Sequence, residues 1–323
     1  MIKRNVSINV AENCGFCFGV RRAVDTVYKL RKSTDKKIYV VGELIHNETF
    51  IKRLEKDGVY CIDERDTDRL LHENEDAVFV IRTHGATKQL SEKLLSSGKQ
   101  IVDATCPFVK RIHKIVEENS PECDCTLIIG DRNHPEVIGI RSYAKGDTEV
   151  CLNDEECSQF VNKSTSKKLE KPLLVSQTTG NNEKYVNCQK IIKKLYTKAK
   201  IFDTICNVTE NRQNEVKNMA ECADIMCIIG CTKSSNTKKL YEIALAYCDN
   251  VFLMESAADV PDERFRELYR VNENKGKDGC EADFTVGITA GASTPDDIIQ
   301  EVKVRIEEIF NSDEKQNDGH IND

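Results

Sequence analysis

Three of the fifteen cysteines occupy matching places in a repeating pattern. Three segments each contain an apolar run, a glycine and then a polar loop, and these glycines are Gly42, Gly130 and Gly230. One cysteine precedes the glycine by 25 residues in the first segment and by 24 in the other two; these are Cys17, Cys106 and Cys206. Thiolates suit soft metal chemistry. Three of them would leave one iron of an iron–sulfur cube without a protein ligand, open to a substrate.

Other interpretations of these cysteines stay open. Cys14 and Cys17 form a C-x-x-C, which is typical of dithiols at a helix N-terminus. Cys14 has no counterpart in the other two segments, so we favour Cys17 as the ligand and Cys14 as an incidental neighbour. Three ordinary buried cysteines are a second alternative. A catalytic zinc is a third, although structural zinc sites usually take four ligands with two on a short knuckle.

Polar residues follow the apolar runs, where a strand would end. They are His46, Asn47, His84, His134, Glu136, Thr178, Thr179, Ser234, Ser235, Asn236 and Ser293. Hydrogen-bond donors dominate this set, and helix N-termini would add backbone N–H groups that favour anions. The set predicts a phosphate or diphosphate pocket in which the one carboxyl, Glu136, donates a proton. The alternative for Glu136 is a residue that only stabilises the start of a helix.

The elements that must position these residues alternate between apolar β-type runs and helical patterns. This alternation predicts an α/β fold, in which ligands gather at the carboxyl ends of the strands. We expect three similar α/β units in a pseudo-threefold arrangement around a central iron–sulfur cluster: 1–103 with Cys17, 104–203 with Cys106, and 204–310 with Cys206. The polar residues 311–323 predict a disordered tail, and the polar insert at 271–283 predicts a surface loop.

Composition narrows the class of protein further. The chain has 323 residues, of which 39% are hydrophobic and 31% charged, and its net charge is −7. That charge argues against a nucleic-acid partner. No apolar run approaches the ~20 residues of a membrane span, and the first residues lack the apolar stretch of a signal peptide. We therefore expect a cytoplasmic protein without a membrane partner.

Eight segments also resemble one known family: GFCFGV, GELIHN, THGAT, DATCP, NHPEV, SQTT, KSSN and ITAGAS. They resemble the signature of the 4-hydroxy-3-methylbut-2-enyl diphosphate reductase family, and the resemblance extends to about residue 308. It implies a three-lobed α/β fold around one [4Fe–4S] cluster with three cysteine ligands and one open iron. It also implies the last step of the methylerythritol phosphate route to isoprenoids. There the allylic hydroxyl of (E)-4-hydroxy-3-methylbut-2-enyl diphosphate is removed to give isopentenyl and dimethylallyl diphosphate.

The resemblance also implies a role for each matching residue. Cys17, Cys106 and Cys206 would be the cluster ligands, and the diphosphate would be held by His46, His84, Ser234, Ser235, Asn236 and Ser293. His134 and Thr178 would lie near the substrate hydroxyl, and Glu136 would donate the proton. Cys14, Cys231 and Lys233 depart from the family pattern at flanking positions.

The sequence contains no flavin or dinucleotide fingerprint, so the electrons must come from outside. A small acidic ferredoxin or flavodoxin is the expected donor. Two other functions stay open: a non-catalytic iron–sulfur sensor, and a zinc-dependent phosphate-ester hydrolase.

Overall fold

The computed structural model describes residues 5–73, 76–164, 169–272 and 283–317. Two compact units divide the chain, one of residues 18–210 and one of the terminal segments 1–17 and 211–323. The strands of the described residues form three four-stranded sheets in which every pairing is parallel. The predicted α/β class is therefore confirmed.

The first sheet has the strand order β3-β2-β4-β5. Its central strands, β2 and β4, are continuous apolar runs that are buried throughout, as a parallel sheet covered on both faces requires. The elements of this part are α1 (Phe18–Ser33), β2 (Ile38–Val41), α2 (Glu48–Lys56), β3 (Val59–Ile62), η1 (Glu64–Asp66), α3 (Thr67–Glu73), β4 (Val78–Ile81), α4 (Lys88–Ser96) and β5 (Gln100–Asp103).

The second sheet repeats this order as β7-β6-β8-β9. Its central strands, β6 and β8, are again buried along their whole length. The elements are α5 (Pro107–Asn119), η2 (Ser120–Glu122), β6 (Cys125–Ile129), α6 (Pro135–Tyr143), β7 (Thr148–Cys151), α7 (Asp154–Ser164), β8 (Pro172–Ser176), α8 (Asn182–Leu195) and β9 (Lys200–Ile201).

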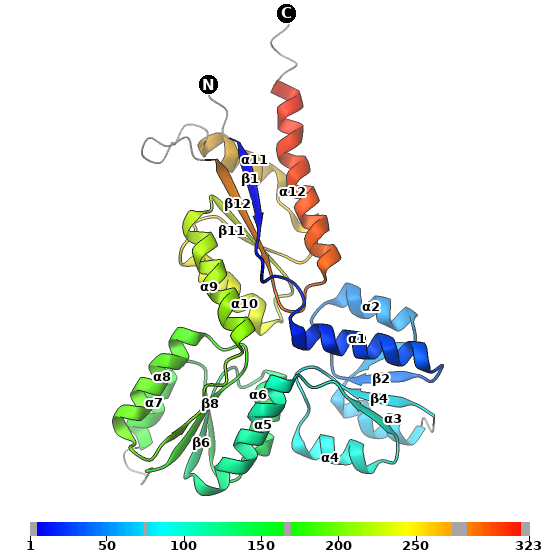
Figure 1. Ribbon diagram of the computed structural model, residues 1–323, viewed down its shortest axis with the longest axis vertical. Coiled ribbons are helices and arrows are strands. Elements are labelled where there is room, and N and C mark those ends of the chain that lie inside the picture. Colours follow the sequence, from blue (N-terminus) through cyan, green and yellow to red (C-terminus); the bar gives the residue numbers. More distant parts are fainter. Residues whose placement is uncertain (1–4, 74–75, 165–168, 273–282, 318–323) are drawn as a thin grey trace, which may run out of the picture. The chain divides into compact units, whose positions relative to one another are not determined.

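The third sheet combines the first strand of the chain with strands from its end, in the order β11-β10-β12-β1. β1 (Val6–Val10) runs beside β12 in parallel, with Val6 opposite Phe284 (Figure 1). The other elements are α9 (Asn207–Cys222), β10 (Ile225–Ile229), α10 (Ser235–Leu245), β11 (Val251–Met254), η3 (Ala257–Asp259), α11 (Asp262–Asn272), β12 (Phe284–Ala290) and α12 (Asp296–Asn317).

This pairing changes the expected division of the chain. The boundary 1–103 would place β1 with the first sheet, whereas β1 completes the third. Here β1 takes the edge position that β5 and β9 hold in their own sheets. In each case the edge strand leads into one of the three matching cysteines, and a helix follows. The repeat is therefore correct in register but permuted along the chain, because a sequence pattern does not show which strands pair.

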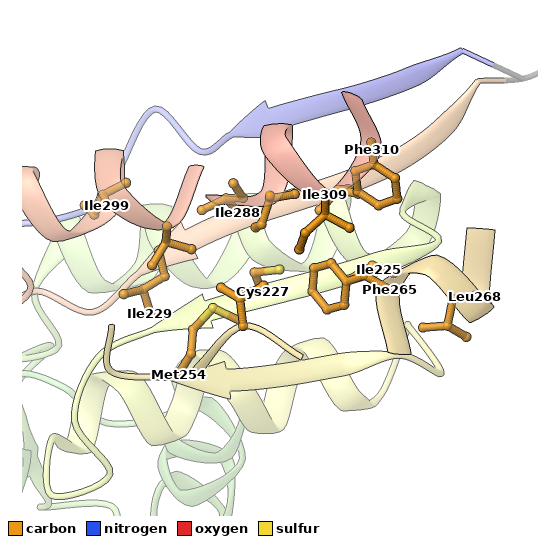
Figure 2. Close-up of a cluster of buried hydrophobic side chains, with 14 of the residues drawn as sticks. Ile225, Cys227, Ile229, Met254, Phe265, Leu268, Ile288, Ile299, Ile309 and Phe310 are labelled. Atoms are coloured by element: carbon orange, nitrogen blue, oxygen red, sulfur yellow. The ribbon is translucent and has the colours of Figure 1, made fainter. Parts of the chain in front are cut away.

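The core of the third sheet lies between its strands and α11 and α12. Figure 2 shows Ile225 and Cys227 of β10 with Phe265 of α11 and Ile309 of α12, all of them buried.

The predicted disordered tail is wrong in part, because α12 continues to Asn317. The glutamate, lysine and glutamine in that segment are good helix formers.

Residues 318–323 of the expected tail lie outside the described residues, as do residues 273–282 of the insert. No helix of the described part of the chain is long and apolar enough to cross a membrane.

Candidate functional site

The three matching cysteines share one backbone hydrogen bond. Each donates its N–H to the carbonyl of the second residue past the end of a central strand: β4, β8 or β12. The pairs are Cys106 with Thr83 at 2.9 Å, Cys206 with Thr178 at 3.0 Å and Cys17 with Ala292 at 3.2 Å. All three side chains are partly buried. The three cysteines are therefore equivalent in their backbone hydrogen bonding as well as in their sequence spacing.

The loop that carries Cys17 is fixed by two charged residues of α9. The Arg212 guanidinium donates to the Gly15 carbonyl at 2.7 Å. The Glu215 carboxylate accepts the backbone N–H groups of residues 12 and 13 at 2.6 and 3.0 Å. These charge-assisted bonds pair backbone groups of residues 12, 13 and 15, which lie beyond the end of β1.

Cys14 lies on the same loop but in a different environment. Its side chain packs against the hydrophobic core of the third sheet. Burial raises the pKa of the Cys14 thiol, and the nearby Arg212 only partly offsets this. Cys14 therefore remains a protonated thiol that packs as a small apolar group.

A second set of equivalent positions lies four residues after the repeat glycines. These positions are His46, His134 and Ser234. The His134 ring caps α6 by accepting from Glu136 N–H, and the Ser234 hydroxyl caps α10 by accepting from Thr237 N–H. In the first sheet the cap of α2 is Asn47, one residue further on. Strand ends and helix starts thus place each of these polar side chains at the carboxyl edge of its own sheet.

The repeat glycine of the first sheet is required by its neighbours. Gly42 has a φ of +81°, which L side chains rarely adopt. A Cβ atom there would lie 2.1 Å from Nη1 of Arg82. Arg82 is itself buried and pairs with Glu64 at 2.7 Å. The glycine therefore leaves room for a buried guanidinium directly behind the loop that carries His46.

The unit of residues 18–210 brings three histidines together. The ring centroids of His46 and His84 are 5.2 Å apart, and those of His84 and His134 are 5.3 Å apart. Glu43 Oε2 lies 2.8 Å from His46 Nδ1 and orients that ring. The three histidines do not occupy equivalent positions. His84 follows β4 and corresponds to Thr179 and Ser293, whereas only His46 and His134 correspond to each other.

The three rings meet the spacing of a metal site, but their hydrogen bonding favours an anion. One nitrogen from each ring lies within 4.8 Å of the others. His134 Nδ1 accepts the N–H of Glu136 at 3.2 Å, so the neutral ring carries its proton on Nε2. A metal ligand needs a ring nitrogen with an available lone pair. His134 instead presents an N–H donor to whatever occupies the site.

The electrostatics of His84 also fit an anion. Burial, then His134 and His46, hold its pKa well below the usual value. The ring is therefore neutral near pH 7 while no anion lies beside it. A negative ligand would reverse this effect, since a nearby opposite charge favours the protonated imidazole.

Glu136 is 1% exposed, and both oxygens of its side chain accept hydrogen bonds from Thr178. Its Oε1 accepts the backbone N–H of Thr178 at 2.6 Å, and its Oε2 accepts the Thr178 hydroxyl at 2.9 Å. Burial raises the pKa of Glu136 to about 7, although the bonds from Thr178 lower it. The carbonyl of Thr178 in turn accepts the N–H of Cys206. The carboxyl is therefore a proton store that titrates near neutrality.

Several predicted substrate residues carry buried polar atoms with no hydrogen-bond partner among the described residues. These atoms are Nε2 of His46, Nδ1 of His84, both polar atoms of the Asn236 amide and Oγ of Ser293. Buried polar groups are normally paired. Of the fifteen such atoms among the described residues, two lie in His46 and His84 of the unit of residues 18–210 and three lie in Asn236 and Ser293 of the terminal unit.

The remaining predicted residues have these places. Ser234 caps α10, Ser235 begins that helix and is partly buried, and Asn236 is buried in its first turn. Ser293 adjoins Ala292, whose carbonyl accepts the Cys17 N–H, in the terminal unit.

The sequence analysis did not single out four charged residues that support the site: Glu43, Arg82, Arg212 and Glu215. A charged residue directly after a buried strand, as in VFVIR, was a usable signal for Arg82.

The fold and the site define a class: an α/β protein of three like parallel sheets whose strand ends hold imidazole donors and a buried proton-carrying carboxyl. The chain belongs to the LytB protein family, whose model matches residues 8–307. It is 36% identical to the 4-hydroxy-3-methylbut-2-enyl diphosphate reductase of Caldanaerobacter subterraneus subsp. tengcongensis, over 96% of this chain and 100% of that one. It is 39% identical to the Campylobacter hominis reductase, over 93% and 98%.

Two solved structures agree with this family. The structure of (E)-4-hydroxy-3-methyl-but-2-enyl diphosphate reductase, the terminal enzyme of the non-mevalonate pathway, has a TM-score of 0.65 and 35% identity over 94% of this chain and 99% of that chain. The E-1-hydroxy-2-methyl-but-2-enyl-4-diphosphate reductase of Plasmodium falciparum has a TM-score of 0.76 and 26% identity over 94% and 87%.

Proposed function

We propose that this protein is a 4-hydroxy-3-methylbut-2-enyl diphosphate reductase. It would remove the allylic hydroxyl of (E)-4-hydroxy-3-methylbut-2-enyl diphosphate and release isopentenyl and dimethylallyl diphosphate. The family and the names of its reductase members support this. Partly buried thiols, equivalent in sequence register and backbone hydrogen bonding, form a donor set that suits an iron–sulfur cluster. Cys17, Cys106 and Cys206 would hold one [4Fe–4S] cluster, which would supply electrons and a Lewis-acidic iron without a protein ligand.

The diphosphate would be bound by polar side chains at strand ends and helix starts, four of which carry buried polar atoms with no hydrogen-bond partner among the described residues: His46, His84, Asn236 and Ser293. His46 and His84 would contribute from the unit of residues 18–210, and Ser234, Ser235, Asn236 and Ser293 from the terminal unit. A ligand with many acceptor oxygens satisfies several buried donors at once, which offsets the cost of burying them. It also fixes the orientation of the allylic end, and such positioning can contribute ~7–11 kcal/mol to lowering a barrier.

Proton delivery would fall to Glu136 and Thr178. A carboxyl with a pKa of about 7 is about half protonated near neutral pH, so a large fraction of the molecules carry a proton that can be released, which is what general acid catalysis needs. The Thr178 hydroxyl already contacts Oε2 and can pass that proton toward the substrate hydroxyl. His134 would add an Nε2–H donor near the same group. The observation that carries this proposal is the buried Glu136–Thr178 pair, in the same unit as His46 and His84, whose buried ring nitrogens have no hydrogen-bond partner among the described residues.

A zinc-dependent phosphate-ester hydrolase is the competing function, since the three histidines have metal-site spacing. The hydrogen bond to His134 Nδ1 counts against it. Electrons for the reductase would come from a small acidic ferredoxin or flavodoxin in the cytoplasm.

Anaerobic purification followed by metal analysis and a reduced-dye assay tests the proposal. We expect about four iron and four sulfide per chain. Oxidation of the dye should depend on the allylic diphosphate and yield both products. The same preparation from a Cys106→Ser variant should lose most of its iron, whereas Cys14→Ser should keep it. A colourless protein that contains zinc and releases phosphate would contradict the reductase. An iron–sulfur protein that leaves the substrate unchanged would favour the sensor.

A further inference from the structure

The core of the second sheet holds a group of cysteines that the proposed reaction does not use. Cys125 of β6, Cys151 of β7, Cys157 of α7 and Cys188 of α8 are all buried in one hydrophobic cluster. Cys157 and Cys188 have no exposed surface. None of the four corresponds to the cysteines of the repeat.

Two of these thiols are in direct contact. The helices α7 and α8 pack against each other (Figure 1), and Asn187 Nδ2 of α8 donates to Asp154 Oδ2 of α7 at 3.1 Å. Beneath this bond, Cys157 and Cys188 share a side-chain hydrogen bond. This bond lowers the pKa of Cys157 and raises that of Cys188. Cys188 is therefore the donor, and Cys157 is the thiol that ionises first.

We propose that Cys157 and Cys188 form a dithiol site, separate from the three repeat cysteines, which a peroxide oxidises to a disulfide between α7 and α8. The Cys157 thiolate attacks one peroxide oxygen, the O–O bond breaks, and a sulfenic acid and hydroxide result. The Cys188 sulfur then displaces the oxygen from Cys157, which leaves as water with the Cys188 proton. Two thiols lose two electrons and two protons in total, and one peroxide becomes two waters.

The neighbouring cysteines favour this pair over the alternatives. Burial raises the pKa of the Cys151 thiol to about 12, so it stays protonated and unreactive. A soft-metal site is not supported, because the three histidines are the one group of the described residues with metal-ligand spacing. The packed helices α7 and α8 hold Cys157 and Cys188 side by side, which is the juxtaposition that a disulfide requires.

Burial sets the rate of this reaction. A peroxide reaches the pair only when α7 opens locally, so oxidation should be slow and should accelerate in urea below the unfolding midpoint. Once closed, the disulfide links residues 157 and 188 and restricts the unfolded chain, which should raise the melting temperature of the oxidised protein.

Peptide mapping of the anaerobically prepared full chain after graded hydrogen peroxide tests the site. We expect a reducible peptide pair containing Cys157 and Cys188, 2 Da lighter than the two thiol peptides. The buried cysteines Cys227 and Cys248 serve as a matched pair, since the Cys248 thiol contacts the Ala223 carbonyl instead of another thiol. They should remain thiols under the same dose. In Cys188→Ser, dimedone should trap Cys157 as a sulfenic acid.

Two results would overturn the site, and neither depends on a variant that must fold. One is that Cys157 and Cys188 stay reduced even in urea just below the unfolding midpoint, after prolonged peroxide exposure that oxidises the exposed Cys222. The other is that Cys157 links to Cys151 or Cys125 in the wild-type chain.

Discussion

Thr178 donates both of its hydrogen-bonding groups to the carboxyl of Glu136, the backbone N–H at 2.6 Å and the hydroxyl at 2.9 Å. One residue therefore fixes both carboxyl oxygens inside an environment that excludes water. The backbone N–H can only donate, so Oε1 accepts in both protonation states. In the neutral carboxyl the proton lies on Oε2 and the Thr178 hydroxyl oxygen accepts it, whereas the hydroxyl donates to Oε2 of the carboxylate. The hydroxyl next to Oε2 is the route by which that proton leaves.

Glu136→Gln should abolish most turnover without disturbing binding. The glutamine amide can accept the Thr178 N–H and donate to its hydroxyl, so the pocket keeps its shape while the acidic proton is lost. Removing a general acid typically costs about 100- to 10,000-fold. We expect kcat to fall in this range, with iron content and substrate affinity close to wild type. In the wild type kcat should decline as the pH rises through about 7, because the proton store empties. Near-normal turnover in the variant would remove Glu136 from the mechanism.

The same substitution should change how stability depends on pH. The Glu136 pKa is about 7 in the folded chain and 4.5 as its ordinary value. Between these values the unfolded chain ionises while the folded chain keeps its proton, so the free energy of unfolding falls as the pH rises. At one pKa unit per ~1.4 kcal/mol, the fall is on the order of 3 kcal/mol. Glu136→Gln should therefore match the wild type near pH 4 and exceed it at pH 8. Urea unfolding of both proteins measures the difference, and parallel curves would contradict a buried neutral carboxyl.

Thr178→Val should move the pH profile and not simply weaken the enzyme. The hydroxyl bond from Thr178 lowers the pKa of Glu136. Valine keeps the backbone N–H but lacks this bond, so the pKa of Glu136 should rise in the variant. The alkaline limb of kcat should therefore shift to higher pH, while turnover falls because the proton route is cut. Thr179→Val is the matched control, since its hydroxyl accepts from the Gln177 side chain. If both variants show the same profile, Thr178 has no special role in proton delivery.

The sequence predicted the features that recur in each of the three sheets. It did not predict strand pairing or the contacts that occur in one sheet alone. The apolar runs predicted the buried central strands. The spacing of Cys17, Cys106 and Cys206 predicted equivalent positions, and in the structure these positions make equivalent backbone hydrogen bonds. Strand pairing was not predictable, because β1 joins residues that lie more than 200 positions further along the chain. The side chains that hold the Cys17 loop in place were not predictable either. The bonds of Arg212 and Glu215 to the Cys17 loop join residues that are far apart in the sequence, and no sequence pattern predicts them.

His84→Gln should reduce the number of protons taken up when an anion binds. The unliganded ring is neutral near pH 7 because its pKa is held well below the usual value. An adjacent diphosphate reverses that shift, so binding should take up a proton and affinity should rise as the pH falls from 8 to 6. Calorimetry with inorganic diphosphate in buffers of different ionisation enthalpy measures the uptake. Diphosphate itself titrates in this range, so the wild type must be compared with the variant.

The exposed His72 of α3 offers a matched control for this measurement. His72→Gln should leave the proton uptake of the wild type unchanged. Equal uptake in His84→Gln and the wild type would show that His84 does not meet the anion.

Ser293→Ala should stabilise the ligand-free protein while it weakens binding. The Ser293 hydroxyl is buried and has no hydrogen-bond partner among the described residues, so removing it ends a desolvation cost of about 1 kcal/mol. The next residue gives the opposite case, because the Thr294 hydroxyl donates to the Ile229 carbonyl at 3.0 Å. Thr294→Val removes that bond, although the carbonyl still accepts the Gly291 N–H at 2.8 Å, and should lower the free energy of unfolding by about 1 kcal/mol. Urea unfolding without ligand, followed by KM for the allylic diphosphate, separates the two. A polar group retained at a cost in stability indicates a ligand. If Ser293→Ala loses stability or keeps its KM, the hydroxyl has a structural role and the diphosphate lies elsewhere.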